Sequence, residues 1–185
     1  MIEYFDVVDE RDRPTGVLTT RNDAHERGLR HRIAAILVFT AEGKLLVQAH
    51  KYLERKMDHS AGGHVGTGED YVIAAAREVF EELGLKTALE YIATVVPPLA
   101  HYEVFDPAIR HTFGVFATTA PRDWEFVPNE EVDLLQEMGV EEIVSLMNTT
   151  PDRFLWGFMA SLGAYLRVTK SPFKIMAYGR DWSNL

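Results

Sequence analysis

The stretch from residue 63 to 85, GHVGTGEDYVIAAAREVFEELGL, constrains this chain more than any other part of its sequence. No glycine or proline interrupts residues 71–83, and three alanines stand at 74–76, so a helix is favoured there. Apolar residues at helical spacing predict one stripe packed against a core. They are Val72, Ala76, Val79 and Leu83. Gly84 follows directly and predicts a left-handed cap that ends the helix.

Glu78, Glu81 and Glu82 project from roughly the opposite side of this predicted helix. Like charges one turn apart repel and would weaken a helix unless a bound cation offsets them. Oxygen ligands select hard divalent ions, here Mg²⁺ with Mn²⁺ as the alternative. Arg77 lies one turn before Glu81, so we predict that it pairs with this carboxylate and orients it. The pattern therefore predicts a metal site formed by the three glutamates.

Four glycines, at positions 62, 63, 66 and 68, precede the predicted helix. They predict a loop whose backbone approaches a ligand closely, just before a helix N-terminus that favours anions. Phosphate is the ligand that this arrangement indicates, with Gly62 and Gly63 in contact with it. Glu69 and Asp70 stand at the same N-terminus, where acidic side chains complement the helix dipole and can cap it. Glu69 has a structural and a catalytic interpretation, and both stay open.

The joint spacing of these residues resembles the signature of the Nudix family. The fixed positions of that signature are matched by Gly63, Glu69, Arg77, Glu78, Glu81, Glu82 and Gly84. A surface helix with a solvated acidic face would explain the glutamates alone, but it would not explain this spacing. The resemblance implies an α/β fold, namely an α/β/α sandwich around a mixed β-sheet. It also implies Mg²⁺-dependent hydrolysis of a nucleoside diphosphate linked to another moiety.

Composition limits the architecture and the partners. A chain of 185 residues with 46% hydrophobic residues can bury one sizeable core, so we expect a single domain. The formal charge of −9 disfavours an extended nucleic-acid surface, whereas a metal could still attract a small diphosphate. The absence of cysteine excludes disulfides and thiolate metal sites. An acidic N-terminus and the lack of a long apolar run favour a cytoplasmic protein without membrane contact.

Alternation and turn residues place the remaining elements. Predicted strands cover 4–8, 17–20, 32–39, 44–50, 89–96 and 112–118, and predicted helices cover 22–28, 140–147 and 152–168. The first two strands form a hairpin within an N-terminal extension of about residues 1–30. The last helix and an apolar tail make a C-terminal segment of about residues 151–185, whose aromatic residues predict docking rather than disorder. The apolar surface of this segment is consistent with a homodimer.

The run from Phe5 to about Leu85 resembles a branch of the family related to isopentenyl diphosphate isomerase. It shares an acidic hairpin, a histidine, Gly-Leu and then His-Arg before a strand. In the isomerases, two such histidines help to bind a metal, and a cysteine acts with a glutamate in proton transfer. Here residues 58–61 lie where the cysteine motif would be, and the three glutamates of the hydrolases are intact. Both departures favour hydrolysis, so His25 and His31 are interpreted as capping, packing or substrate contacts and not as metal ligands.

Further candidate residues lie around the motif. Arg55, Lys56 and His64 flank the glycines and are candidates for contacts with a diphosphate, although solvated charge is the alternative for the two cations. In the segment Asn129-Glu130-Glu131-Val132, we select Glu131 as the further glutamate that many relatives use as a metal ligand or base. An acidic, solvated turn is the alternative there. Loop aromatics that could stack on a nucleobase or pack their own loops are Tyr102, Phe105 and Trp124.

Three functions follow from these patterns. The leading hypothesis is a Mg²⁺-dependent pyrophosphohydrolase in which Glu78 or Glu131 accepts a proton from the attacking water. The runner-up is an isomerase of isopentenyl diphosphate, which the missing cysteine opposes. A Nudix-like module that binds a nucleotide without turnover is the third, and the complete motif opposes it. The pattern identifies neither the organic part of the substrate nor the number of metal ions.

Overall fold

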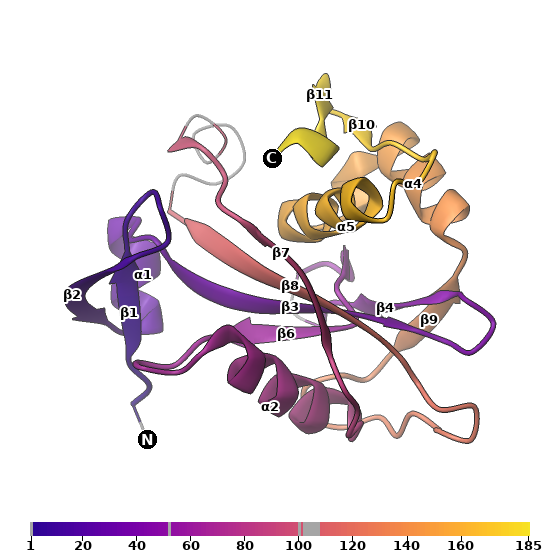
Figure 1. Ribbon diagram of the computed structural model, residues 1–185, viewed down its shortest axis with the longest axis horizontal. Helices are drawn as coiled ribbons and strands as arrows, with labels where there is room; N and C mark the ends of the chain where they lie inside the picture. The colour runs from indigo at the N-terminus through magenta and orange to yellow at the C-terminus, as the bar shows by residue number, and fades with distance from the viewer. Residues whose placement is uncertain (1, 52, 100, 102–107) are drawn as a thin grey trace.

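The computed structural model describes residues 2–51, 53–99, 101 and 108–185 (Figure 1). The strands are β1 (Phe5–Val8), β2 (Pro14–Thr19), β3 (His31–Phe39), β4 (Leu45–Ala49), β5 (Met57–Asp58), β6 (Ala61–His64), β7 (Glu90–Val95), β8 (His111–Thr119), β9 (Leu135–Met138), β10 (Met176–Ala177) and β11 (Arg180–Asp181). The helices are α1 (Arg21–Arg27), α2 (Tyr71–Leu83), α4 (Val140–Thr149) and α5 (Trp156–Val168), with short 3₁₀ turns η1 (Pro151–Arg153) and η2 (Trp182–Asn184). Every strand and helix that the sequence predicts is present, with ends that shift by a few residues.

A seven-stranded mixed sheet forms the centre of the fold. Its main path runs β5-β4-β3-β8-β7, with β6 paired to β3 and β9 paired to β4. The pair β3 and β8 is parallel, and the other pairs of this sheet are antiparallel. The nearly continuous apolar run of β3 is buried along its length, as expected for a strand that is covered on both faces.

Helices cover both faces of this sheet (Figure 1). Successive residues of β3 point to opposite faces, so Ala34 and Ile36 pack with the core under α2. Ala35 and Leu37 pack with the core under α5. Two apolar layers therefore hold the structure together, and the predicted α/β/α sandwich around a mixed sheet is confirmed.

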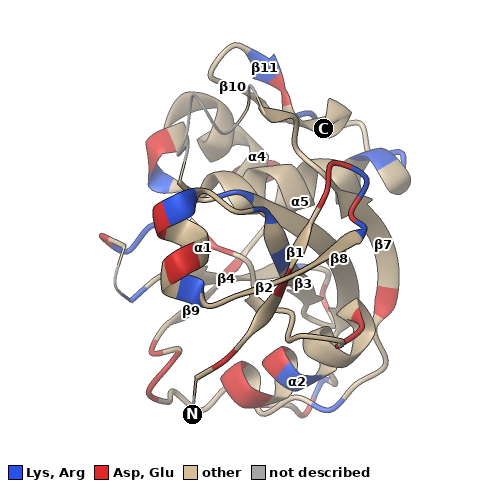
Figure 2. Cartoon of the chain, turned by 90° about the vertical axis from the view of Figure 1, so that its left-hand side faces the viewer, with Lys and Arg blue, Asp and Glu red and all other residues tan. Residues whose placement is uncertain are grey.

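The N-terminal hairpin and α1 lie over the end of the sheet where β3 begins. β1 and β2 form a separate two-stranded sheet, and the Val8 N–H donates to the Arg30 carbonyl at 2.9 Å. The side chain of Thr20 caps the N-terminus of α1, and Gly28 ends the helix in a left-handed conformation with φ 59°. Figure 2 looks onto this end of the molecule, with α1 near the viewer. The hairpin and α1 thus bring His25 toward the start of β3.

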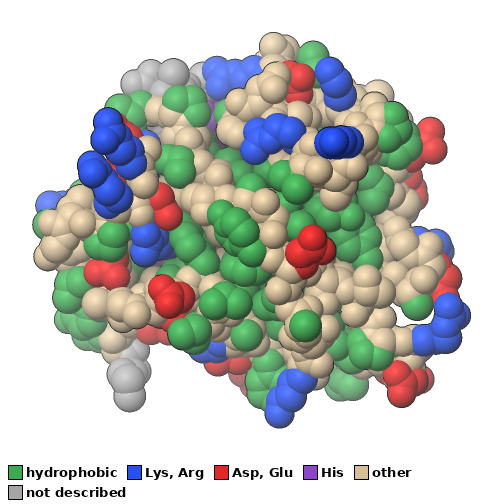
Figure 3. All heavy atoms as spheres, in the orientation of Figure 1, with side chains coloured by type: hydrophobic (Ala, Val, Ile, Leu, Met, Phe, Trp, Pro, Cys, Tyr) green, Lys and Arg blue, Asp and Glu red, His purple; other side chains and the backbone are tan. Residues whose placement is uncertain are grey.

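The apolar tail that follows α5 packs against this helix, as the aromatic residues of the tail predicted. The Trp182 side chain is 1% exposed, and its indole N–H donates to the Ala177 carbonyl at 3.0 Å. A Cβ added to Gly163 of α5 would lie 2.5 Å from the Trp182 carbonyl oxygen, so glycine permits this close approach. Apolar side chains remain at the surface on the face that Figure 3 shows. Tyr91, on the edge strand β7, is 56% exposed. Among the described helices, none has the length and apolar composition needed to cross a membrane.

Two expectations about the motif are wrong in detail. The apolar stripe of α2 is rotated, because Val72 is 51% exposed and Ala76 is exposed. The buried positions of α2 are Ala74, Ala75, Glu78, Val79 and Leu83. Gly62 and Gly63 belong to strand β6 and not to a loop, since residues 61–64 pair with β3. Glycine disfavours a strand by itself, so this pairing depends on the neighbouring strand and on the helix packed against it.

Candidate active site and histidine cluster

Glu78 and Glu82 lie on the flank of α2 that faces β6, and not on an exposed face as their spacing predicted. Glu78 is 8% exposed, Glu82 is partly buried and Glu81 is exposed. A Cβ added to Gly63 would lie 2.2 Å from Glu78 Oε1, so glycine at this position leaves the space that the carboxylate fills. Acidic positions of α2 appear at the lower edge of Figure 2. We call Glu78, Glu81 and Glu82 the glutamate site.

Arg77 joins the members of the signature into one network. Its guanidinium donates to Glu78 at 2.7 Å, to Glu81 at 3.2 Å and to Glu69 at 3.1 and 3.2 Å. It also donates to the His64 carbonyl at 3.0 Å, which ties α2 to β6. The predicted pair with Glu81 is therefore present, and it is one of several contacts. The guanidinium that holds these carboxylates contacts Glu78 and Glu81 of the glutamate site directly.

Glu69, in the turn before α2, accepts two hydrogen bonds from Arg77 and so belongs to this network. It accepts a hydrogen bond from the Gly66 N–H at 2.8 Å in addition to those from Arg77. Burial would raise the pKa of Glu69, but the hydrogen bonds from Arg77 and Gly66 outweigh it and lower the pKa below its usual value. Asp70 takes the N-cap position of α2 without a side-chain hydrogen bond to the helix. Glu69 thus links the Arg77 guanidinium to the backbone of the turn before α2.

Glu82 is held by β4 and β6. Its Oε2 accepts from Gln48 Nε2 at 2.6 Å and from the Gly62 N–H at 3.3 Å. Burial, followed by the charge of Glu78, raises the pKa of Glu82 to about 8. Burial also raises the pKa of Glu78, against the opposing effect of Arg77. Two carboxyl groups whose ionisation is opposed by burial form a donor set that fits a hard divalent cation.

The loop before β9 carries Glu131 to the end of α2. Asn129 Nδ2 donates to the Glu82 carbonyl at 2.8 Å, while Asn129 Oδ1 accepts from the N–H groups of Glu131 and Val132 at 2.9 and 2.8 Å. Glu131 is exposed, and its charge is close enough to Glu78 to contribute to the raised pKa of that group. The structure therefore brings Glu131 to the glutamate site, and Asn129 fixes the loop there.

Other predicted contacts fall in different places. Both guanidinium NH groups of Arg55 donate to the Asp133 carboxylate, at 2.5 and 2.9 Å, so this cation is already paired. Lys56 is half-buried next to β5. Trp124 packs at the edge of the core under α2. Tyr102 and Phe105 lie outside the described residues.

Sequence reasoning missed two polar residues at the glutamate site. Gln48 contacts Glu82 directly, and the charge of Asp58 contributes to the raised pKa of Glu82. Asp58 faces Gln48 across the β4–β5 pair and contacts His59 Nδ1 at 2.7 Å. These residues come from strands that precede the signature, and the sequence shows no spacing that would link them to it.

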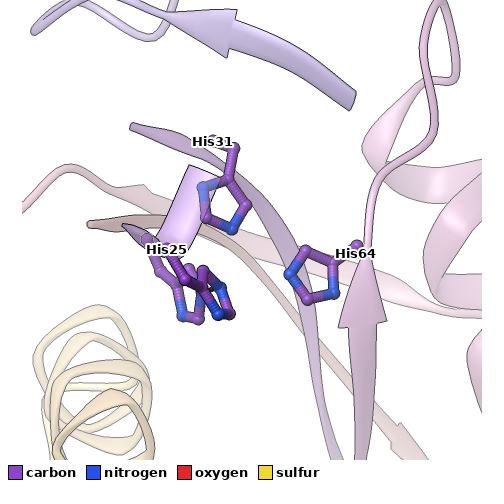
Figure 4. A group of neighbouring side chains, drawn as sticks. His25, His31 and His64 are labelled. Carbon is purple, nitrogen blue, oxygen red and sulfur yellow. Dashed lines mark hydrogen bonds between the residues drawn. The ribbon is translucent and has the colours of Figure 1, made fainter. Parts of the chain in front are cut away.

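Four histidines form a second polar cluster near the start of β3. His25 of α1, His31 of β3, His64 of β6 and His111 of β8 each place a ring nitrogen within 4.8 Å of the nitrogens of the other three. The rings of His31 and His64 are stacked with their centroids 5.1 Å apart. Figure 4 shows the labelled rings of His25, His31 and His64 directed toward one another. We call these four residues the histidine cluster.

The chemistry of this cluster fits a metal ion with nitrogen ligands. His31 Nδ1 lies 2.8 Å from the Leu29 carbonyl, which places the proton on Nδ1 and leaves a lone pair on Nε2. Within the described part of the chain, the buried Nε2 atoms of His31 and His64 have no hydrogen-bond partner. Burial lowers the pKa of His31 to about 4 and of His64 to about 3, so both imidazoles are neutral at pH 7. Neutral, convergent imidazoles suit Zn²⁺ and similar ions.

The interpretation of His25 and His31 as isolated capping or packing residues is therefore incomplete. The sequence did not link them to His64 or His111, because the four residues meet only when β3 pairs with β6 on one side and β8 on the other. His31 and His111 are paired directly in the parallel register. A histidine directly before each of two predicted strands was the signal available, but the strand order that makes the two histidines neighbours could not be read from it.

The glutamate site and the histidine cluster lie on opposite faces of β6. Gly63 pairs with Ala34, which packs under α2, whereas His64 pairs with Ile33, which packs under α5. Because neighbouring residues of a strand point to opposite faces, Gly63 faces Glu78 and the His64 ring faces the other histidines. Arg77 bonds to the backbone between them through the His64 carbonyl. A short strand thus separates two candidate metal centres.

Comparisons with known proteins agree with this geometry. The family described as the NUDIX domain matches residues 29–156. An isopentenyl-diphosphate Delta-isomerase of Pectobacterium atrosepticum is 31% identical over 80% of this chain and 83% of its own length. An uncharacterised Nudix hydrolase of Yersinia pestis is 31% identical over 82% of each chain. The crystal structure of the DR0079 protein of Deinococcus radiodurans superposes with a TM-score of 0.63 at 22% identity, over 80% of this chain and 90% of that one, and supports the fold.

Proposed function

This chain belongs to the Nudix family and is a hydrolase of phosphoanhydride bonds, and from this premise we propose that it is a Mg²⁺-dependent enzyme acting on a nucleoside diphosphate-type or related diphosphate. The glutamate site carries the proposal. Glu78 is buried and Glu82 partly buried against β6, and the pKa of each is raised above the usual value. Mn²⁺ shares the oxygen preference of Mg²⁺ and is the alternative ion.

Each part of the site has a proposed role. Glu78, Glu81 and Glu82 would hold the cation, whose contribution when bound is Lewis-acid polarisation of the diphosphate oxygens. Arg77 holds Glu78 and Glu81 in place and is itself positioned by Glu69. Glu131 or Glu78 would accept the proton of the water that attacks phosphorus. The backbone of Gly62 and Gly63 in β6 would lie along the diphosphate.

The first test is hydrolysis of a panel of phosphoanhydrides with Mg²⁺ and with chelator, followed by chromatography of the nucleotide, sugar phosphate, phosphate and pyrophosphate products. Nucleoside di- and triphosphates, dinucleoside polyphosphates, nucleotide sugars and isopentenyl diphosphate cover the classes of organic group. We expect hydrolysis of at least one compound that chelator abolishes and that falls at least about a hundredfold in Glu82→Gln. Glu142→Gln, at an exposed position of α4, is the matched control and should retain activity. Full activity of Glu82→Gln, or hydrolysis in chelator, would reject the metal assignment.

The histidine cluster favours a second candidate function, the isomerisation of isopentenyl diphosphate. The P. atrosepticum relative is named as such an isomerase, and the cluster offers a metal centre separate from the glutamate site. The lack of cysteine opposes this function, because another residue would then have to transfer the proton. We therefore rank it below hydrolysis.

Product analysis and metal content separate the two candidates. Isopentenyl diphosphate would be incubated with the protein and the dimethylallyl isomer sought, in the wild type and in His31→Gln. Zn²⁺ binding measured by calorimetry should be lost in His31→Gln and retained in His50→Gln, a histidine outside the cluster. Isomer formation that depends on His31 would establish the second function, whereas phosphate release without isomer would support hydrolysis.

A further inference from the structure

A pocket of about 340 Å³ opens on the same face of the sheet as the glutamate site. Its floor includes Leu46 of β4 and Leu135 of β9, and its walls include Trp124 and Phe126 from the loop between β8 and β9. All four side chains belong to, or pack against, the core under α2. A volume of this size is at the lower end of those found for small-molecule sites. None of the residues assigned to the glutamate site lines it.

Strand register connects the pocket to the glutamate site. Leu46 and Gln48 are two residues apart on β4, so their side chains share a face and lie about 7 Å from one another along the strand. Leu135, on the pocket floor, is the direct partner of Gln48 across the β4–β9 pair. Gln48 in turn donates to Glu82 at 2.6 Å. Gln48 therefore lies between the pocket, whose floor includes its strand partner Leu135, and Glu82 of the glutamate site.

The lining combines aromatic rings with an excess of carboxylates. The Trp124 and Phe126 rings lie 6.4 Å apart between centroids. Three carboxylates line the pocket against one guanidinium, and Arg122 is paired with Glu42 at 2.6 Å. Glu125 and Glu137 are the other two acids, and Glu137 lies 3.8 Å from Lys44 Nζ, which leaves Glu125 as the candidate acceptor. Such a lining repels a further phosphate group, accepts hydrogen bonds from N–H donors and offers faces on which a planar ring can stack.

We infer that this pocket binds the organic group of the substrate, and that this group is a nucleobase bearing an amino group. The diphosphate would lie at the glutamate site and the base in the pocket, with Trp124 stacked on the ring and Glu125 accepting from the amino group. The inference rests on the proposed function, since it names the substrate class of that site. An alkyl diphosphate would offer the aromatic walls no planar ring and Glu125 no N–H donor.

The experiment compares diphosphates that differ in the organic group alone. ADP and CDP carry amino groups, UDP has a ring without one, and isopentenyl diphosphate has no ring. We expect kcat/KM to be highest for ADP or CDP. Trp124→Ala should lower that value about tenfold, the effect typical of a lost stacking contact, and leave isopentenyl diphosphate unchanged. Glu125→Gln should narrow the difference in kcat/KM between CDP and UDP. Tyr91 is an exposed aromatic residue of β7, and Tyr91→Ala should leave kcat/KM unchanged for all four diphosphates.

Binding of nucleosides without phosphate separates this inference from the proposed function. Calorimetry with adenosine and cytidine, in chelator, should show binding to the wild type that Trp124→Ala loses and Trp124→Phe retains. Such binding together with no hydrolysis of any diphosphate would support the pocket and reject the hydrolase proposal for these substrates. Hydrolysis with equal kcat/KM for all four diphosphates, or nucleoside binding that Trp124→Ala leaves intact, would overturn the assignment of the pocket.

Discussion

The carboxyl group of Glu78 occupies the space that a side chain at residue 63 would fill. A Cβ at that position would come within 2.6 Å of three atoms of the Glu78 carboxyl group, which is closer than van der Waals contact allows. The glycine therefore leaves room for the carboxylate in this position, and it does not serve an unusual backbone angle. A small residue in β6 thus determines where a carboxylate of α2 can lie.

Gly63→Ala tests this relation directly. We expect the methyl group to displace the Glu78 carboxylate by about an ångström and to reduce metal-dependent turnover roughly a hundredfold, the usual effect of such a misplacement. Circular dichroism would check that the fold persists, and steady-state kinetics would measure the loss. Gly139→Ala is the matched control, because a Cβ there meets no atom within 4 Å. Equal activity of the two variants would contradict the assigned role of Gly63.

The raised pKa of Glu82 predicts how stability depends on pH in the absence of metal. Burial raises this pKa from 4.5 to about 8, so the folded protein binds a proton that the unfolded chain releases near pH 4.5. The corresponding stability is present below pH 4.5 and is lost as the pH rises toward 8. Relative to Glu82→Gln, the wild type in chelator should therefore lose free energy of unfolding across this range, by an amount on the order of a few kcal/mol. Urea unfolding at several pH values measures the difference, and parallel curves would refute the prediction.

At the scale of elements, the loop between β8 and β9 adds the Glu131 carboxylate to the groups that β6 and α2 provide. Asn129 connects the loop to the last turn of α2 through the Glu82 carbonyl and organises the turn that holds Glu131. The last carbonyls of a helix have no partner within the helix, so this amide satisfies one of them while it fixes the loop. Asn129 is thus a positioning residue, and its effect on catalysis should depend on Glu131.

A double-mutant cycle measures that dependence. Asn129→Ala should lower kcat about tenfold while KM changes little, because the glutamates of α2 keep their positions but Glu131 is held less firmly. In a Glu131→Gln background, Asn129→Ala should have almost no further effect, since coupled residues are not additive. Gln136→Ala, at an exposed position of β9, is the control for a loss of side-chain contact nearby. Additive effects of Asn129→Ala and Glu131→Gln would show that Asn129 does not act through Glu131.

At the scale of the whole molecule, the two ends of the chain complete opposite parts of the fold. The N-terminal hairpin stacks Phe5 on His64 with ring centroids 4.6 Å apart and so covers the histidine cluster. The C-terminal residues bury Trp182 and Ile175 in the core that includes α5. Among the described residues, neither the hairpin nor the C-terminal tail contributes a side chain to the glutamate site, whereas His25, which follows the hairpin, belongs to the histidine cluster.

Trp182→Ala should destabilise the protein without altering the chemistry of the folded fraction. Removal of a fully buried tryptophan side chain typically costs about 3–5 kcal/mol of unfolding free energy. Denaturant unfolding would measure the loss, and turnover per folded molecule at low temperature should equal that of the wild type. Met176→Ala, at a half-exposed position of the same segment, should cost less than about 1 kcal/mol. A small effect of Trp182→Ala would mean that the tail does not contribute to the core as its burial indicates.

The sequence by itself determined which local elements form and which family the chain belongs to. Helix α2, its glycine cap and the paired contact of Arg77 with Glu81 depend on residues within a few turns of one another, so periodicity and spacing predicted them. The resemblance to the Nudix family predicted the α/β/α sandwich around a mixed sheet. The rotation of the α2 stripe was missed, because local periodicity does not state which flank of a helix a neighbouring strand will bury.

The tertiary structure alone decided which distant residues meet. Gln48 of β4 reaches Glu82 because α2 packs on the sheet, and His31 meets His111 because β3 pairs with β8. No local pattern encodes either contact between residues so far apart in the chain. The raised pKa of Glu82 likewise follows from its burial against β4 and β6, and the sequence does not state which side chains become buried. Short-range interactions fix elements through spacing, whereas pairing, burial and charge at a site depend on the energy of the whole packed molecule.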